Sequence, residues 1–318
     1  MNEKTLDVLS VGLMFCDIII KPVSKEIFDM DSQVLDTLKF ASGGDAFNAA
    51  VNMSKLGLKV ALAGMIGNDM QGKFLNEEAI KSGIDTTHIK QNESASTATS
   101  IVIVENNGER HFAVHGNANN FLTPECVPDT ALESASIVHI GSAMALPGLE
   151  KQALSDFFRK AKTAGAYTSM DLTWGGDGNW LERIEDALYH TDFFMPSIQE
   201  AQHVSGLKEP KDMAEFFKKY GFKALVIKLG DKGCFITDYS QSFTIPAFNV
   251  PNAVDTTGAG DSFVSGFLAS KIRGKDLYEC GVIGNAVAAF CVQEAGATTG
   301  IKNWDETMKY IKNKNEEK

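Results

Sequence analysis

Short apolar runs alternate with longer amphipathic stretches along most of the 318 residues. Several apolar runs are almost continuously hydrophobic and end at Gly, Asp or Pro, which is typical of parallel strands covered on both faces. These predicted strands occupy residues 6–12, 60–67, 136–141, 166–171, 192–197 and 224–230. Helical periodicity predicts helices over residues 46–56, 72–82, 149–164, 181–189, 258–271 and 277–294. The alternation predicts an α/β fold with a doubly wound, mainly parallel sheet flanked by helices.

Two segments depart from this alternation. Phe15–Lys21 and Ser100–His115 have the two-residue alternation of β ribbons, and the second contains a hairpin turn at Asn107–Gly108. A hairpin needs a place outside a parallel sheet. We therefore expect a small β-sheet that projects as a lid, inserted from about residues 13–41 and 97–118 into a single α/β domain spanning residues 1–318.

Composition and charge limit the partners. Hydrophobic residues make up 44% and charged residues 22%, as in ordinary globular proteins, and 41 acidic against 30 basic residues give a net charge of −11. An acidic surface disfavours nucleic acid and anionic lipid as partners. A small anionic ligand stays compatible with this charge, because backbone N–H groups can bind phosphate locally.

Targeting and cysteine patterns predict a cytoplasmic protein with no membrane segment. The five cysteines are scattered and contain no C-x-x-C pair, which disfavours a disulfide scaffold or a zinc site. The first residues lack the basic and apolar regions of a signal peptide, and no apolar run approaches the ~20 residues that cross a bilayer. His111 and His115 share one side of the predicted hairpin, but with no carboxylate at ligand spacing we expect packing or solvent-facing histidines and no metal pair.

The strongest chemical signal is Asp255-Thr-Thr-Gly-Ala-Gly-Asp261 at the start of a predicted helix. Gly258 and Gly260 allow a ligand to approach the backbone, and the free N–H groups of a helix N-terminus favour an anion. Asp261, in the first turn, suits a base that orients a hydroxyl for attack on a phosphoryl group. A plain Asp-rich helix cap is the alternative, which seven specified residues at one helix start make less favoured.

This run resembles the C-terminal signature of the ribokinase-like (PfkB) carbohydrate kinases. The stretch Ser42-Gly-Gly-Asp-Ala-Phe-Asn-Ala-Ala, continuing through Leu56-Gly57 to the residues between Gly64 and Gly72, resembles the N-terminal signature of the same family. Two signatures in the right order are more specific than either alone, and the resemblance covers nearly the whole chain. The chain has no G-x-x-x-x-G-K-[ST] motif, so its phosphate chemistry differs from that of a P-loop enzyme.

The resemblance implies a role for each matching residue. It makes Asp261 the catalytic base and places the transferring γ-phosphoryl of ATP in an anion hole formed by Gly258, Ala259 and Gly260. It assigns acceptor binding to four residues, Asp17, Gly43, Gly44 and Asn48. On local sequence alone, Asp17 could equally cap a strand end, and the glycines could form a simple strand-to-helix turn.

The resemblance also implies sites for the nucleotide and for cations. Matching residues near ATP are Lys228, Gly230, Gly233 and Asn285, although a strand–turn–strand and a helix-surface Asn would look similar. Glu200 matches the residue that organises Mg²⁺ through water, whereas Ser197 stands where Asn is usual. Asp255 and the Thr257 carbonyl are the expected contacts for the K⁺ that many family members bind. The exposed face of the lid predicts a homodimer that forms through it.

The acceptor is expected to be a small neutral sugar. The run from Asp171 to Trp180 lacks the Arg of the family's Asp-x-Asn-x-Arg motif, which disfavours an acidic or phosphorylated acceptor, and residues 141–147 lack the Glu of ribose-specific members. A nucleoside or pseudouridine is the alternative acceptor. A non-catalytic sugar- or nucleotide-binding regulator on the same fold is an alternative of another class, against which Asp261 and the anion hole argue.

Overall fold

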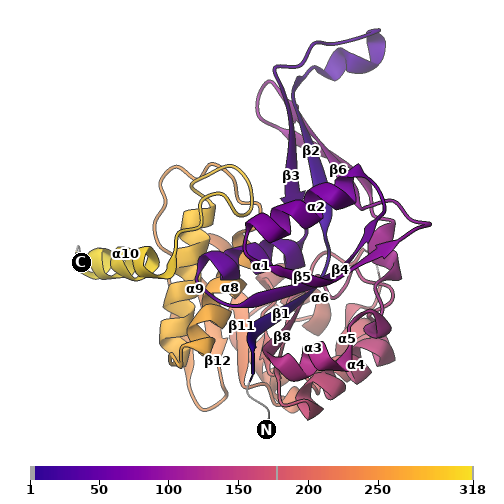
Figure 1. Ribbon diagram of the computed structural model, residues 1–318. Coiled ribbons are helices and arrows are strands. Elements are labelled where there is room, and N and C mark those ends of the chain that lie inside the picture. The colour runs from indigo at the N-terminus through magenta and orange to yellow at the C-terminus, as the bar shows by residue number, and fades with distance from the viewer. Residues whose placement is uncertain (1–3, 177, 317–318) are drawn as a thin grey trace.

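The computed structural model describes residues 4–176 and 178–316 (Figure 1). Within them, a nine-stranded sheet has the order β13-β12-β11-β10-β9-β8-β1-β4-β5. It is parallel from β11 to β5, and β12 and β13 form an antiparallel edge. Its strands are β1 (Leu6–Gly12), β4 (Val60–Gly67), β5 (Asp85–Asn92), β8 (Ala135–Gly141), β9 (Tyr167–Met170), β10 (Phe193–Phe194), β11 (Ala224–Lys228), β12 (Cys234–Thr237) and β13 (Ser242–Ile245).

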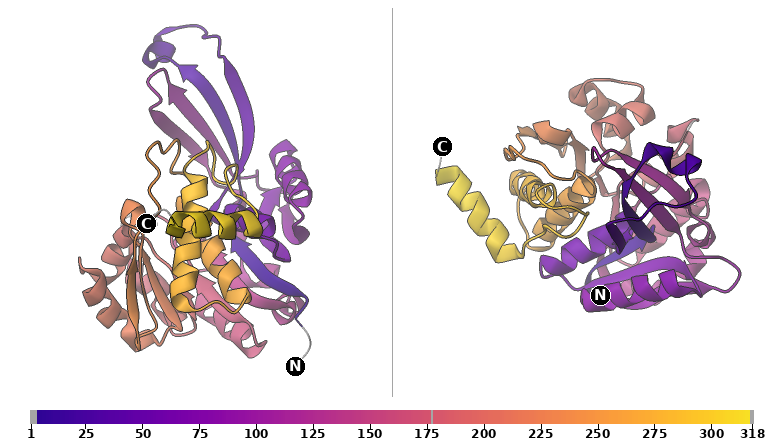
Figure 2. Two further views of the ribbon diagram at one scale, coloured as in Figure 1. Left: turned by 90° about the vertical axis from the view of Figure 1, so that its left-hand side faces the viewer. Right: turned by 90° about the horizontal axis from the view of Figure 1, so that it is seen from above.

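Helices cover both faces of this sheet, as Figures 1 and 2 show. Buried apolar residues on one side come from α3 (Asp129–Ser134), α4 (Lys151–Thr163), α5 (Trp180–Leu188), α6 (Ile198–Ser205) and α7 (Pro210–Phe217). Those on the other side come from α1 (Asp45–Lys55), α2 (Met70–Lys81), α8 (Ala259–Ile272), α9 (Leu277–Cys291) and α10 (Trp304–Glu316). Two separate cores on either side of one sheet confirm the predicted doubly wound architecture.

A second sheet of four strands, in the order β3-β2-β6-β7, stands away from the central sheet (Figure 2). Its strands are β2 (Phe15–Val23), β3 (Thr37–Gly43), β6 (Thr99–Glu105) and β7 (Arg110–His115). The hairpin between β6 and β7 turns at the predicted Asn107–Gly108, where Gly108 has a φ of 87°. We refer to these four strands as the small sheet.

Several elements differ from the sequence-based expectations. The strand expected over residues 192–197 is reduced to β10, because Pro196 has no N–H to donate and Ser197 already caps α6. The edge strands β5 and β13 are mostly polar and exposed or half-buried, so the apolar-run criterion missed them. Helices α3, α6, α7 and α10 and strands β3 and β12 were also not predicted.

Helix α8 places the Asp255–Asp261 run beside the carboxyl ends of the central strands. It is buried over residues 262–270, and it packs against α9 where Gly266 and Gly284 let the two backbones approach. None of the helices in residues 4–176 and 178–316 is both long and apolar enough to cross a membrane. All five cysteines are free thiols.

Candidate active site

The N-terminus of α8 forms a backbone cradle. Gly258 caps the helix with a φ of 76°, and a Cβ atom there would lie 2.3 Å from the Ala297 Cβ atom, so the position requires glycine. At Gly260, a Cβ atom would lie 3.3 Å from the Lys228 Nζ atom. The Ala259 N–H donates to the Thr256 carbonyl at 3.2 Å, and the positive end of this helix and the Lys228 ammonium face the same small volume, which suits an anion.

Asp261 meets Asn48 of α1 at this helix start. The Asn48 Nδ2 atom donates a hydrogen bond of 2.9 Å to the Asp261 Oδ2 atom, joining residues 213 positions apart. The Asn48 side chain is buried, and its Oδ1 atom has no partner among the described residues. A buried amide oxygen without a donor is costly, so this atom is available to a ligand hydroxyl.

Burial raises the pKa of Asp261 well above its ordinary value, and the charge of Asp45 adds to this rise. Asp45 was not among the predicted site residues. Asp45 begins α1, and its Oδ2 atom accepts a hydrogen bond from the Ser142 hydroxyl. Burial also raises the pKa of Asp45, to about 6. Its position inside the N-terminal signature was the one sequence signal that could have identified it.

Lys228 carries the positive charge of this site. Its ammonium forms an ion pair with Asp171, which directly follows β9, and both side chains are nearly buried. Burial opposes the charged form of Lys228, but the carboxylates of Asp171 and Glu200 outweigh it and raise the lysine pKa. The ammonium thus stays charged, next to Gly260 and Asp261.

Glu200 and Ser197 form a capping box at the start of α6. The Ser197 N–H donates to the Glu200 Oε2 atom at 2.6 Å, and the Glu200 N–H donates to the Ser197 hydroxyl at 3.3 Å. Serine is among the best N-caps, so this helix start tolerates it where the family has Asn. Burial raises the pKa of Glu200 to about 7, while the Lys228 ammonium opposes this rise. The Glu200 Oε1 atom is a hard oxygen donor near the cradle, and it suits a water bound to Mg²⁺.

Asp17 lies on the small sheet at the edge of this site. A Cβ atom at Gly43 would lie 2.5 Å from the Asp17 Oδ2 atom, so the Asp17 carboxylate packs directly over the Gly43 backbone. Burial raises the pKa of Asp17 to about 6, and a hydrogen bond with Ser100 opposes the rise. Gly44 caps α1 with a φ of 95°, so these glycines shape the strand-to-helix turn as well as the pocket.

The other predicted nucleotide residues lie around the β11–β12 turn. Gly233 adopts a φ of 93° in the turn that starts at Gly230, and a Cβ atom there would collide with the Ile245 carbonyl. Asn285 is buried in α9 and donates to the backbone carbonyls of Ile245 and Pro246. The structure therefore gives these residues a role in holding the β11–β12 turn and the chain after β13.

The expectation that no carboxylate lies at ligand spacing from His111 was wrong. Its Nε2 atom lies 2.6 Å from the Glu105 Oε1 atom, because the hairpin brings the two strands into register. Glu105, Glu109 and His111 could together offer ligand atoms to a metal. The Lys25 ammonium, 3.3 Å from Glu105 and 3.9 Å from Glu109, already supplies a positive charge there.

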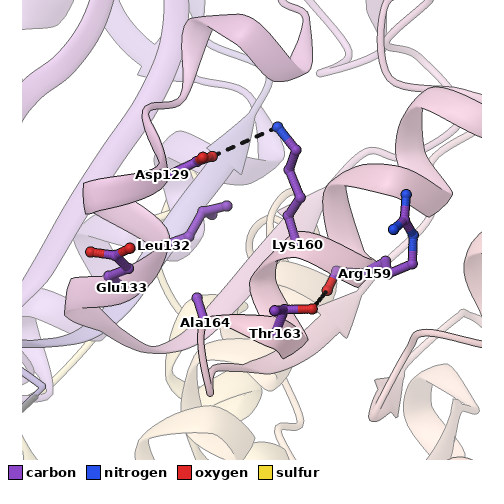
Figure 3. Close-up of a pocket in the computed structure, with 7 residues that line it drawn as sticks. All are labelled: Asp129, Leu132, Glu133, Arg159, Lys160, Thr163 and Ala164. Carbon is purple, nitrogen blue, oxygen red and sulfur yellow. Dashed lines mark hydrogen bonds and ion pairs between the residues drawn. The ribbon is translucent and has the colours of Figure 1, made fainter. Parts of the chain in front are cut away.

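Figure 3 shows a pocket between α3 and α4. It is lined by Asp129, Leu132, Glu133, Arg159, Lys160, Thr163 and Ala164. Both helices lead into the amino ends of β8 and β9 here, whereas ligands of open α/β sheets bind at the carboxyl ends. The Lys160–Asp129 ion pair of 3.7 Å already spans the pocket, which we therefore place outside the candidate site.

Comparisons with known proteins give one consistent result. The family model described as pfkB family carbohydrate kinase matches residues 5–304. A probable fructokinase-5 of Arabidopsis thaliana is 30% identical over 86% of this chain and 89% of its own. The ribokinase of Thermotoga maritima has a TM-score of 0.83 at 26% identity, covering 96% of this chain and 99% of its own. A putative ribokinase II of E. coli in complex with ATP and Mg²⁺ also has a TM-score of 0.83, at 22% identity over 97% and 99% of the two chains.

Proposed function

The chain belongs to the pfkB family of carbohydrate kinases, and we propose that it transfers the γ-phosphoryl group of ATP to a hydroxyl of a small neutral sugar. The observation that carries this proposal is the Asp261 carboxylate, oriented by Asn48 at the start of α8 beside the Lys228 ammonium. A base, an anion cradle and a fixed cation then surround one point, as phosphoryl transfer requires.

In the reaction, the acceptor hydroxyl oxygen forms a bond to the γ-phosphorus while its proton passes to the Asp261 carboxylate. The bond between the γ-phosphorus and the bridging oxygen breaks, and ADP leaves with that electron pair. Negative charge on the transferring group faces the positive end of α8 at residues 258–260 and the Lys228 ammonium. The unpaired Asn48 Oδ1 atom and the Asp17 carboxylate accept hydrogen bonds from other acceptor hydroxyls.

Glu200 is the residue that would hold Mg²⁺, through water. When bound, this ion neutralises charge on the triphosphate. Gly230, Gly233 and Asn285 shape the backbone beside which the rest of the nucleotide binds.

The charges around the acceptor support a neutral molecule. Asp17, Asp45 and Asp261 surround its expected position, and the Lys228 ammonium is already paired with Asp171. These carboxylates would repel an acidic or phosphorylated acceptor.

We further propose that the small sheet acts as a lid and as the contact between two copies of the chain. Asp17 and Ser100 lie on its site-facing side, so Ile18, Phe40 and Ile101, in register on the other side, point away from the site. Phe74 of α2 packs against Phe40, yet Leu38, Phe40 and Ile101 stay exposed. A second copy of this face would bury the apolar patch.

The test is ADP formation with ATP, Mg²⁺ and a panel of neutral sugars, sugar acids, sugar phosphates and nucleosides. Turnover with a neutral sugar is expected, and Asp261→Asn should lower its kcat by about 10²–10⁴-fold because the base is lost. Asp129→Asn, in the pocket between α3 and α4, is the control and should keep the wild-type rate. A nearly unchanged rate in Asp261→Asn would overturn the base assignment. Tight ligand binding without turnover of any acceptor would favour the regulator.

A further inference from the structure

Arg110 connects the small sheet to the loop that leads into α8. It is the first residue of β7, and its guanidinium reaches a segment 145 positions further along the chain. The Nη2 atom donates to the Asp255 Oδ1 atom at 2.9 Å, and the Nη1 atom donates to the Thr257 hydroxyl at 3.2 Å. Thr257 directly precedes Gly258, the cap of the anion cradle. One side chain therefore joins the sheet that carries Asp17 to the loop that holds the phosphoryl site.

The oxygens expected to bind K⁺ are already engaged. The Asp255 Oδ1 atom also accepts a hydrogen bond of 2.9 Å from the Thr257 N–H, and its Oδ2 atom accepts one of 3.1 Å from the Gly296 N–H. The Thr257 carbonyl accepts from the Cys291 thiol at 3.3 Å. These donors and the guanidinium occupy both sides of the carboxylate, so this arrangement does not fit a bound K⁺.

The charge at Asp255 is balanced from within the chain. The Asp255 side chain is 10% exposed and that of Arg110 is 36% exposed, so the pair is partly shielded from water. A carboxylate shielded in this way needs a cationic partner, which Arg110 supplies through a hydrogen-bonded ion pair of 2.9 Å.

We propose that Arg110 is a positioning residue that takes the place of a monovalent cation at Asp255 and links the small sheet to the anion cradle at Gly258–Gly260. The effect on phosphoryl transfer rests on the proposed kinase function; the replacement of the cation does not. A planar guanidinium that binds two groups of the loop restrains its conformation more strongly than a single-point contact would. Strand β7 pairs with β6, and β6 pairs with β2, which carries Asp17. The positions of the acceptor and of the anion cradle are therefore coupled.

The experiment compares wild type, Arg110→Ala and Arg110→Lys in KCl and in tetramethylammonium chloride at equal ionic strength. Two quantities are measured, the melting temperature without substrates and the kcat for ADP formation. Wild type should show no K⁺-specific change in either. Arg110→Ala should lose about tenfold in kcat, with a smaller change in acceptor KM, and K⁺ should raise its melting temperature and partly restore its kcat. Arg110→Lys keeps a charge and should stay independent of K⁺.

Lys25→Ala is the matched control, because it removes a cation–carboxylate contact within the small sheet without touching residues 255–258. It should behave as wild type. A K⁺-specific stabilisation or activation of wild type would overturn the proposal, as would an Arg110→Ala variant indistinguishable from wild type in both salts. If no acceptor supports ADP formation, the proposed function fails, while the melting temperatures still decide whether Arg110 replaces the cation.

Discussion

At the scale of single residues, the chemistry of the site is set by carboxylates gathered around one ammonium group. Asp45, Asp171, Glu200 and Asp261 all have raised pKa values, chiefly because they are buried. Lys228 stabilises their charged forms and is kept charged by them. The raised pKa of Asp261 suits its proposed role, because such a base takes up a proton more readily than an ordinary aspartate.

Asp45→Asn should shift the pH dependence of the reaction. Asp261 must be ionised to accept a proton, so kcat/KM should rise with pH as this carboxyl group loses its proton. The negative charge of Asp45 raises the pKa of Asp261, and removing it makes ionisation easier. The rising limb of kcat/KM, measured by ADP formation from pH 4 to pH 9, should therefore move to lower pH. A limb that stays in place or moves to higher pH would show that Asp45 does not act on the base.

At the scale of elements, the site depends on how helices begin at the carboxyl edge of the sheet. Helix α8 starts after a glycine in the left-handed region, which turns the preceding loop sharply and directs the positive end of the helix toward the site. Helix α6 starts with a serine–glutamate capping box that occupies one oxygen of Glu200. Each cap therefore stabilises its helix and also fixes the direction of a functional group.

Gly258→Ala and Gly274→Ala form a matched pair at the two ends of α8. Both glycines have left-handed backbone, with φ of 76° and 72°, so both substitutions should cost about 1 kcal/mol of unfolding free energy from backbone conformation. A Cβ atom at Gly258 would also collide with Ala297, whereas one at Gly274 meets nothing within 4 Å. Gly258→Ala should therefore displace the cradle and lower kcat by about 10²-fold, while Gly274→Ala keeps it. Urea unfolding and ADP formation measure the two effects, and equal losses of kcat would contradict a special role for Gly258.

At the scale of the whole molecule, two apolar cores stabilise the central sheet, whereas Leu38, Phe40 and Ile101 on one face of the small sheet stay exposed. The proposed pairing with another copy would therefore leave both cores undisturbed. The Arg110–Asp255 contact joins the small sheet to the helix start that forms the cradle.

Ile101→Glu should disrupt the proposed dimer, because it places a charge in the middle of the exposed apolar face. In sedimentation velocity, wild type should behave as about twice the 34.5 kDa chain, and the variant as a single chain. Ile80→Glu on α2 is the control, since this exposed isoleucine lies outside the small sheet. A monomeric wild type, or a variant that remains dimeric, would contradict pairing through this face.

The sequence by itself determined the architecture, the family and the residues of the two signatures. Apolar strands such as β4 and amphipathic helices such as α4 are recognisable because local periodicity records which side of an element is buried. The signatures identified Asp261, Asn48 and the glycines for a related reason, because the helix starts and turns they form are local structures with strict residue requirements. Polar edge strands such as β5 lack a periodic apolar pattern and were therefore missed.

Only the tertiary structure decided which charges meet. The Lys228–Asp171 pair joins residues 57 positions apart, and Arg110 reaches Asp255 across 145 positions, distances over which periodicity carries no information. The order of strands brings the ends of β9 and β11 to either side of the short β10, and the small sheet carries Arg110 over the loop before α8. Burial and nearby charges shift the pKa values of the site carboxylates, and Arg110 lies against the expected cation ligand Asp255. Both arise only when distant segments of the chain pack together.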